Sequence, residues 1–69
     1  MENKTIKVEG MSCEHCAQAV SGVLAGIDGV TDIFVSLNEG TASFAHDPAL
    51  APLEAVRAAI TEEGYGAEE

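Results

Sequence analysis

The sequence predicts an α+β fold in which two helices cover one face of a four-stranded antiparallel sheet. The chain has 69 residues, of which 46% are hydrophobic, so it suits a single small domain, residues 1–69, around one core. Its apolar residues change twice from the two-residue period of strands to the 3.6-residue period of helices. Turns containing glycine or proline separate these segments. Together the observations predict six elements in the order β-α-β-β-α-β.

The first half of the chain predicts a strand and an amphipathic helix. Thr5–Glu9 alternates polar and apolar side chains, as strands do, and Gly10 ends the alternation. The helix is expected over 14–27, with Ser12 as its N-cap residue and Asp28-Gly29 at its end. A continuous apolar stripe at helical spacing predicts the buried face: Cys16, Ala19, Val20, Val23, Leu24 and Ile27.

The second half predicts a β-hairpin, a helix and a short last strand. Val30–Leu37 is rich in β-branched and aromatic residues, and the turn Asn38-Glu39-Gly40 leads into a third strand, Thr41–His46. A second helix is expected from Pro52, which suits a first helical turn, and Tyr65–Ala67 is the expected last strand. Two βαβ halves joined by a hairpin form the split-βαβ, or ferredoxin-like, arrangement.

The charge of the chain and its lack of long apolar segments restrict its partners and location. Twelve Asp and Glu residues against three Lys and Arg residues give a net charge of −9 at pH 7. Nucleic acids and anionic membranes attract basic proteins, so we expect neither as a partner. The acidic surface favours a protein with a positive docking face, or else has no electrostatic role. Without a signal-like or spanning segment, we expect a cytoplasmic protein.

The motif with chemical meaning is Cys13-x-x-Cys16, between the first strand and the first helix. Cys13 lies at the helix start and Cys16 in its first turn, so both sulfurs can converge on one point. Unpaired backbone N–H groups and the positive end of the helix dipole stabilise thiolates there. In a reducing compartment such a pair is metal-binding or redox-active more often than a structural disulfide.

The number of ligands narrows the choice of metal. Thiolates are soft ligands that select Cu(I), zinc or iron–sulfur clusters. A structural zinc site needs four ligands, whereas this loop offers two thiolates and at most the imidazole of His15. Cu(I) accepts two or three soft ligands, and Hg(II) shares this preference. The sequence therefore predicts a metal site with Cys13 and Cys16 as ligands and Cu(I) as the first candidate.

Several other side chains allow a structural and a functional interpretation. His15 is expected to be solvated at the helix start, and the alternative is an auxiliary ligand in a second copper site or a metal-bridged dimer. Met11 suits core packing. His46 shares a strand face with Phe44 and is expected to be half-buried. Phe34 is expected to be exposed on the open sheet face or packed at an edge.

The cysteine motif and its surroundings resemble a known family. Met11-Ser12-Cys13-Glu14-His15-Cys16 matches the M-x-C-x-x-C signature of heavy-metal-associated domains, and the chain is most similar to the small free-standing copper chaperones of bacteria. The resemblance covers nearly the whole chain, including Asp28-Gly29-Val30, the 38–40 hairpin, Asp47-Pro48 and Glu63-Gly64-Tyr65.

The resemblance implies a carrier of Cu(I) and assigns residues to it. It implies Cys13 and Cys16 as ligands, Met11 as a buried packing residue, and Tyr65 as an aromatic residue beside the metal loop. The implied partners are metal-binding domains of copper-transporting P-type ATPases, or copper-responsive repressors. The apo-protein is expected to be a monomer, and a copper-bridged homodimer is an alternative for the loaded form.

Two other functions stay open. Cys-x-x-Cys at a helix N-terminus is also the arrangement of thiol–disulfide oxidoreductases, although no Trp or Pro flanks the motif here. The chain also suits a metal-binding module of a larger transporter of copper, mercury or zinc. No paired-carboxylate site, nucleophile–base pair or phosphate-binding glycine loop is recognisable, so we expect no enzyme.

Overall fold

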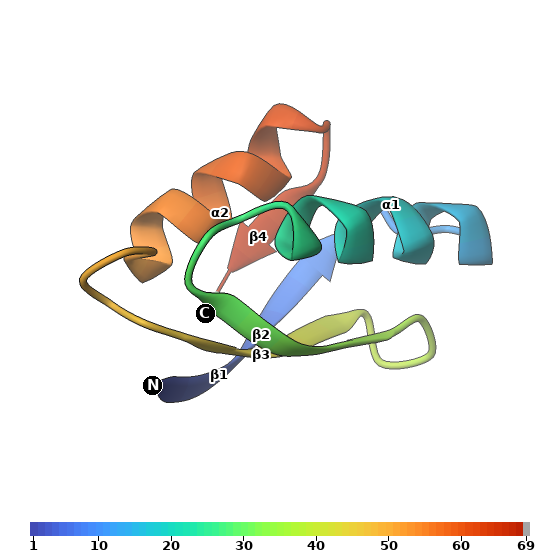
Figure 1. Ribbon diagram of the computed structural model, residues 1–69. Coiled ribbons are helices and arrows are strands. Elements are labelled where there is room, and N and C mark those ends of the chain that lie inside the picture. Colours follow the sequence, from blue (N-terminus) through green and yellow to red (C-terminus); the bar gives the residue numbers. More distant parts are fainter. Residues whose placement is uncertain (69) are drawn as a thin grey trace.

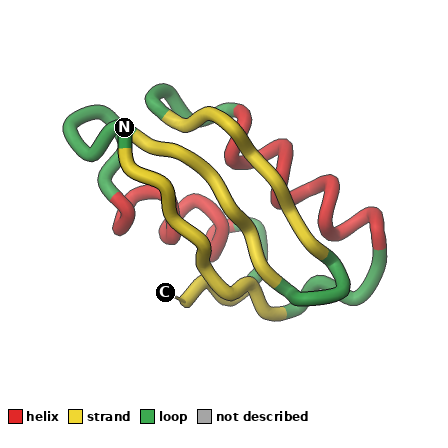
Figure 2. The backbone as a smooth tube through the Cα atoms, turned by 90° about the horizontal axis from the view of Figure 1, so that it is seen from below, coloured by secondary structure: helices red, strands yellow, loops and turns green. Residues whose placement is uncertain are grey.

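The computed structural model describes residues 1–68 and has the predicted element order. Both helices lie on one face of the sheet (Figure 1), and the view from the other side shows the strands uncovered (Figure 2). The predicted α+β sandwich is therefore confirmed. Within the described residues no helix is long and apolar enough to cross a membrane. The elements are β1 (Glu2–Glu9), α1 (Glu14–Ala25), β2 (Val30–Ser36), β3 (Thr41–His46), α2 (Leu53–Glu62) and β4 (Gly66–Glu68).

The sheet has the strand order β2-β3-β1-β4, and all neighbours are antiparallel. β1 and β3 are central, with Ile6 opposite Ala42, and the short β4 pairs only with the end of β1. The β2–β3 register shifts between Thr31 and Phe34, where Asp32 has φ 54°. This irregularity is a β-bulge at an edge strand, a feature that hinders pairing with a further strand.

The core fills the space between the helices and the sheet. Alternate strand residues point toward the helices, and the stripes of the two helices point back, as the sequence periods require. Burying one such side chain stabilises the fold by about 1.5–3 kcal/mol. The largest fully buried side chains are Phe44, Ile6, Leu24, Ile60, Val20 and Val56.

The open face of the sheet is mostly polar. The hydroxyl groups of Thr5 and Ser43 lie 3.0 Å apart on it. Phe34, which pairs with Ser43, is 67% exposed, so the first of the two expectations for this residue is confirmed.

Three expectations about helix α1 are wrong. Cys13, not Ser12, is the N-cap residue, because the first helical hydrogen bonds run to the Cys13 carbonyl. The helix ends at Ala25 with Gly26 as C-cap, because the hydrogen bonds tighten there to a three-residue span, from the Ile27 amide to the Leu24 carbonyl. Ala19 is exposed, because the stripe that meets the sheet is narrower than the apolar pattern.

The strand boundaries and His46 also differ from expectation. β1 begins at Glu2, because Glu2 and its neighbours pair with β3 although they do not alternate in polarity. β4 is shifted by one residue to Gly66–Glu68, since Gly66 is the residue that pairs with Glu9. His46 is fully buried, not half-buried, and its Nδ1 lies 2.7 Å from the Ala51 carbonyl oxygen.

Gly29 connects the first helix to β2 in a conformation that requires glycine. Its φ is +93°, and a Cβ atom at this position would lie 2.9 Å from Cβ of Leu50. Its carbonyl accepts a 2.8 Å hydrogen bond from the amide of Asp47. The turn after α1 and the turn after β3 are therefore fixed to each other at one end of the sheet.

We expect Gly29→Ala to lower the free energy of unfolding by about 1–3 kcal/mol, because it adds backbone strain and a steric overlap with Leu50. Gly22→Ala is the matched control, since Gly22 lies inside α1 with nothing within 4 Å of its would-be Cβ. That change should raise stability by about 0.5–1 kcal/mol. Urea denaturation followed by circular dichroism measures both. Equal effects of the two substitutions would contradict the assignment of Gly29.

Candidate metal site

The loop between β1 and α1 holds both cysteines at the surface. Cys13 has an extended backbone, with φ −156° and ψ 170°, and its carbonyl accepts hydrogen bonds from the amides of Cys16 (3.0 Å) and Ala17 (3.2 Å). These bonds close the first turn of the helix and place Cys16 one turn above Cys13. The spacing in the sequence thus becomes a fixed spacing in space.

The two sulfur atoms face each other. The Sγ atoms of Cys13 and Cys16 lie 3.8 Å apart, and both thiols are free. A metal–thiolate bond is about 2.3 Å long in zinc sites, so two sulfurs up to about 4.6 Å apart can bind one ion. Cys13 is exposed and Cys16 is half-buried. The pair therefore fits a single soft metal ion that stays open to solvent on the Cys13 side.

Local hydrogen bonding favours the thiolate of Cys16. The pKa of Cys16 falls from the ordinary 9.0 to about 7, chiefly through hydrogen bonding from the backbone of Ser12, and further through the Tyr65 hydroxyl and the Cys13 thiol. Partial desolvation acts in the opposite direction but is the weaker effect. Near neutral pH a large fraction of Cys16 is therefore ionised and ready to bind a metal.

Tyr65 comes from the far end of the sequence and lies beside this loop. It follows Gly64, which has φ +96°, and directly precedes β4, the partner of the end of β1. A Cβ atom at Gly10 would lie 3.4 Å from Cδ1 of its ring. Its hydroxyl donates to Cys16, which raises the pKa of Tyr65 because the phenolate could not donate. The tyrosine thus supports one of the two sulfurs.

The other predicted residues have different positions. His15 is exposed in the first turn of α1, whereas Met11 is half-buried and packs against the core. Over residues 1–68, no group of three or more His, Cys, Asp or Glu side chains is placed to hold a metal ion. The geometry thus brings together two thiols, and His15 does not complete a three-ligand cluster in this part of the chain.

The role of Ser12 differs from the predicted one. Its side chain was expected to cap the helix, but the α1 N-cap makes no side-chain hydrogen bond. The main contribution of Ser12 comes from its backbone, which hydrogen-bonds Cys16. Every residue except proline has a backbone N–H group, so the sequence alone does not show which of them donates to a side chain. Only the conformation of the loop could have indicated this donor.

Comparisons with known proteins agree with this geometry. The sequence profile of the heavy-metal-associated domain matches residues 5–66. The copper chaperone CopZ of Staphylococcus epidermidis is 43% identical over 65 residues, which cover 94% of this chain and 96% of that protein.

Solved structures share the fold over almost the full length. A CopZ metallochaperone is 38% identical with a TM-score of 0.89, covering 96% of this chain and 98% of that one. The amino-terminal domain of a potential copper-translocating P-type ATPase from Bacillus subtilis, solved in its Cu(I)-loaded state, is 27% identical with a TM-score of 0.91. The match covers 97% of this chain and 84% of that domain.

We expect Tyr65→Phe to raise the pKa of Cys16 above about 7, because the substitution removes one hydrogen-bond donor and keeps the ring beside Gly10. The pH dependence of alkylation by iodoacetamide, resolved by mass spectrometry at each cysteine, measures this shift in the apo-protein. An unchanged midpoint would show that the hydroxyl does not act on the sulfur.

The lowered pKa of Cys16 makes the stability of the fold depend on pH. The pKa of Cys16 is lower in the folded chain than its ordinary 9.0, so ionisation of this thiol favours the fold. That contribution is complete above about pH 9 and is lost as the pH falls through about 7. Urea midpoints of the reduced protein measured across this range should show a smaller change in Cys16→Ser than in the parent.

Proposed function

Because the chain belongs to the heavy-metal-associated domain family, we propose that it is a copper carrier, which binds one Cu(I) ion between Cys13 and Cys16 and passes it to a protein partner. The observation that carries the proposal is the pair of free thiols, 3.8 Å apart at the exposed start of a helix, with the pKa of Cys16 lowered to about 7. The function is transport, and the chain has no catalytic role.

The ligand set favours Cu(I) over the alternatives. Zinc prefers four ligands in a closed tetrahedral site, and within residues 1–68 no cluster of three suitable side chains is available. Two thiolates satisfy Cu(I), which accepts low coordination numbers and soft donors. Hg(II) has the same preference, so a competition experiment with this ion belongs beside the copper measurement.

The unequal exposure of the two sulfurs indicates the side from which a partner can take the copper ion. A thiolate of the partner approaches the ion from the side of Cys13, which is exposed, and forms a new copper–sulfur bond before an old one breaks. The copper stays Cu(I) throughout, and the released cysteine either remains a thiolate or takes a proton from solvent. Hydrogen bonds from Ser12 and Tyr65 stabilise Cys16 as a thiolate when it is free. The ion therefore need not enter water between the two proteins.

The partner class follows from related domains. The B. subtilis ATPase domain has the same fold and was solved with Cu(I), so a P-type ATPase domain of this kind is the partner that we propose first. A copper-responsive repressor is the second candidate, and a copper-bridged homodimer is a proposed form of the loaded chain. We propose the cytoplasm as its location, because two thiols that bind metal need a reducing compartment to stay reduced.

We expect the reduced protein to bind one equivalent of Cu(I) in competition with a chromogenic chelator under anaerobic conditions. Cys13→Ser and Cys16→Ser should each weaken binding by at least about a hundredfold, because each removes one of two soft ligands. His15→Ala is the control on the same loop and should change the affinity by less than about tenfold.

Three outcomes would redirect the proposal. A loss of tenfold or more in His15→Ala would make His15 a ligand. Tighter binding of Hg(II) or Zn(II) in the parallel titrations would change the cargo. Failure to compete for Cu(I), together with reduction of insulin disulfides by the protein, would indicate a thiol–disulfide oxidoreductase instead.

A further inference from the structure

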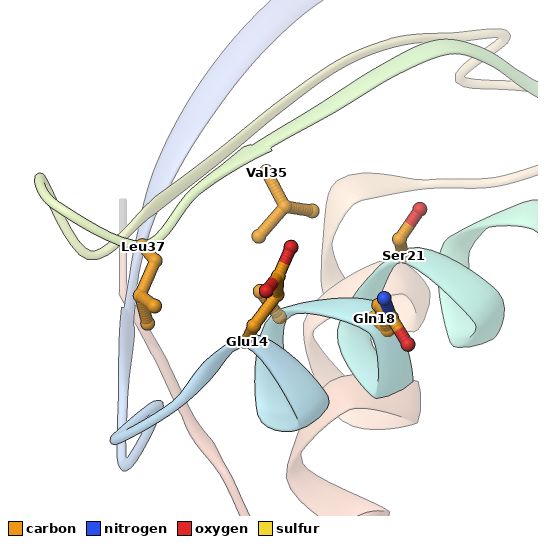
Figure 3. A pocket seen from close by; sticks show the side chains of 6 residues that line it. Glu14, Gln18, Ser21, Val35 and Leu37 are labelled. Carbon is orange, nitrogen blue, oxygen red and sulfur yellow. The ribbon is translucent and has the colours of Figure 1, made fainter.

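A groove runs beside the metal site, between α1 and the end of β2. Its volume is about 350 Å³. One wall is a single face of α1, and the opposite wall is apolar and comes from the end of β2 and the following turn (Figure 3). The residues that line it are Glu14, Ala17, Gln18, Ser21, Val35 and Leu37.

The groove joins an apolar surface to one negative charge. The side chain of Glu14 points from α1 toward Val35, with Leu37 on one side of it and Gln18 on the other (Figure 3). Leu37 is 37% exposed, so this apolar wall is accessible to a partner. An apolar wall beside a carboxylate suits a long cationic side chain. Its aliphatic part can pack on Val35 and Leu37, and its charged end can pair with Glu14.

The groove is adjacent to the point of copper transfer. Glu14 follows Cys13 directly in the chain, and Ala17 follows Cys16. One partner bound at this loop is therefore close to both the copper ligands and the groove.

We propose that this groove receives an Arg or Lys side chain of the copper-accepting domain and sets the orientation in which that domain docks. The inference rests on the proposed function and adds the chemistry of the partner. The charge of the chain supports this occupant. The sequence has twelve Asp and Glu residues but only three Lys and Arg residues, so few cationic side chains of the chain itself can pair with Glu14. Charge favours a basic domain over a second copy of the chain as occupant, because a second copy would bring a further net charge of −9.

The test is the rate of Cu(I) transfer from the loaded chain to the amino-terminal domain of the B. subtilis ATPase, followed by stopped-flow at several salt concentrations. Glu14→Gln should lower the second-order rate constant by about three- to tenfold and flatten its dependence on salt. Leu37→Ser should lower the rate and leave the salt dependence unchanged. Glu14→Lys should slow transfer further than Glu14→Gln.

Glu54→Gln is the matched control. Glu54 also lies in the first turn of a helix, but α2 runs from the opposite end of the molecule (Figure 1), so the substitution removes the same charge far from the groove. Its rate constant should stay within about twofold of the parent. Equal effects of Glu14→Gln and Glu54→Gln would overturn the inference and leave only non-specific attraction by net charge.

The Cu(I) titration of each variant separates this inference from the proposed function. If the parent binds no Cu(I), the proposed function fails and the inference fails with it. If the parent binds Cu(I) but transfers none to the ATPase domain, or transfers it at the same rate in Glu14→Gln and Leu37→Ser, copper carriage stands and the groove is not a docking site.

Discussion

The first turn of α1 is the constraint on which the site depends. The carbonyl of Cys13 accepts hydrogen bonds from the amides of Cys16 and Ala17, so helix geometry sets the backbone positions from which the two sulfurs project. This turn can hold its position only because the rest of the helix is anchored. Val20 and Leu24 are fully buried against the sheet. A core contact two turns away thus determines where the metal ligands lie.

The sequence was sufficient for the fold because periodicity carries that information directly. The alternation around Ile6 and the stripe through Leu24 predict a strand and a helix from polarity alone. The start of β1 was missed because Glu2 is held by backbone pairing with His46, which polarity does not encode. Ala19 was misplaced because small residues occur on both faces of a helix. The polarity pattern of the sequence thus predicts the presence of a helix or strand better than the residues at which it begins and ends.

The candidate site was predictable in its ligands but not in its electrostatics. Cysteine spacing indicates that the sulfurs of Cys13 and Cys16 converge, and the structure places them 3.8 Å apart. The lowered pKa of Cys16 depends first on the backbone of Ser12 and then on Tyr65. The serine acts through an atom that every residue has, and the tyrosine lies about fifty residues away in the chain. Only the folded chain brings these groups together.

The acidic character of the chain raises a physical conflict at this site that the structure resolves. Glu14 places a negative charge next to the two metal ligands, whereas direct hydrogen bonds favour the thiolate of Cys16. The pKa of Cys16 is lowered by hydrogen bonds from Ser12, Tyr65 and Cys13, which act at contact, while the effect of an exposed charge is screened by water. The Glu14 carboxylate can therefore lie over the groove without removing the thiolate that copper needs. Acidic residues are compatible with anionic metal ligands when the ligands have their own donors, and the negative surface then remains available to attract a partner.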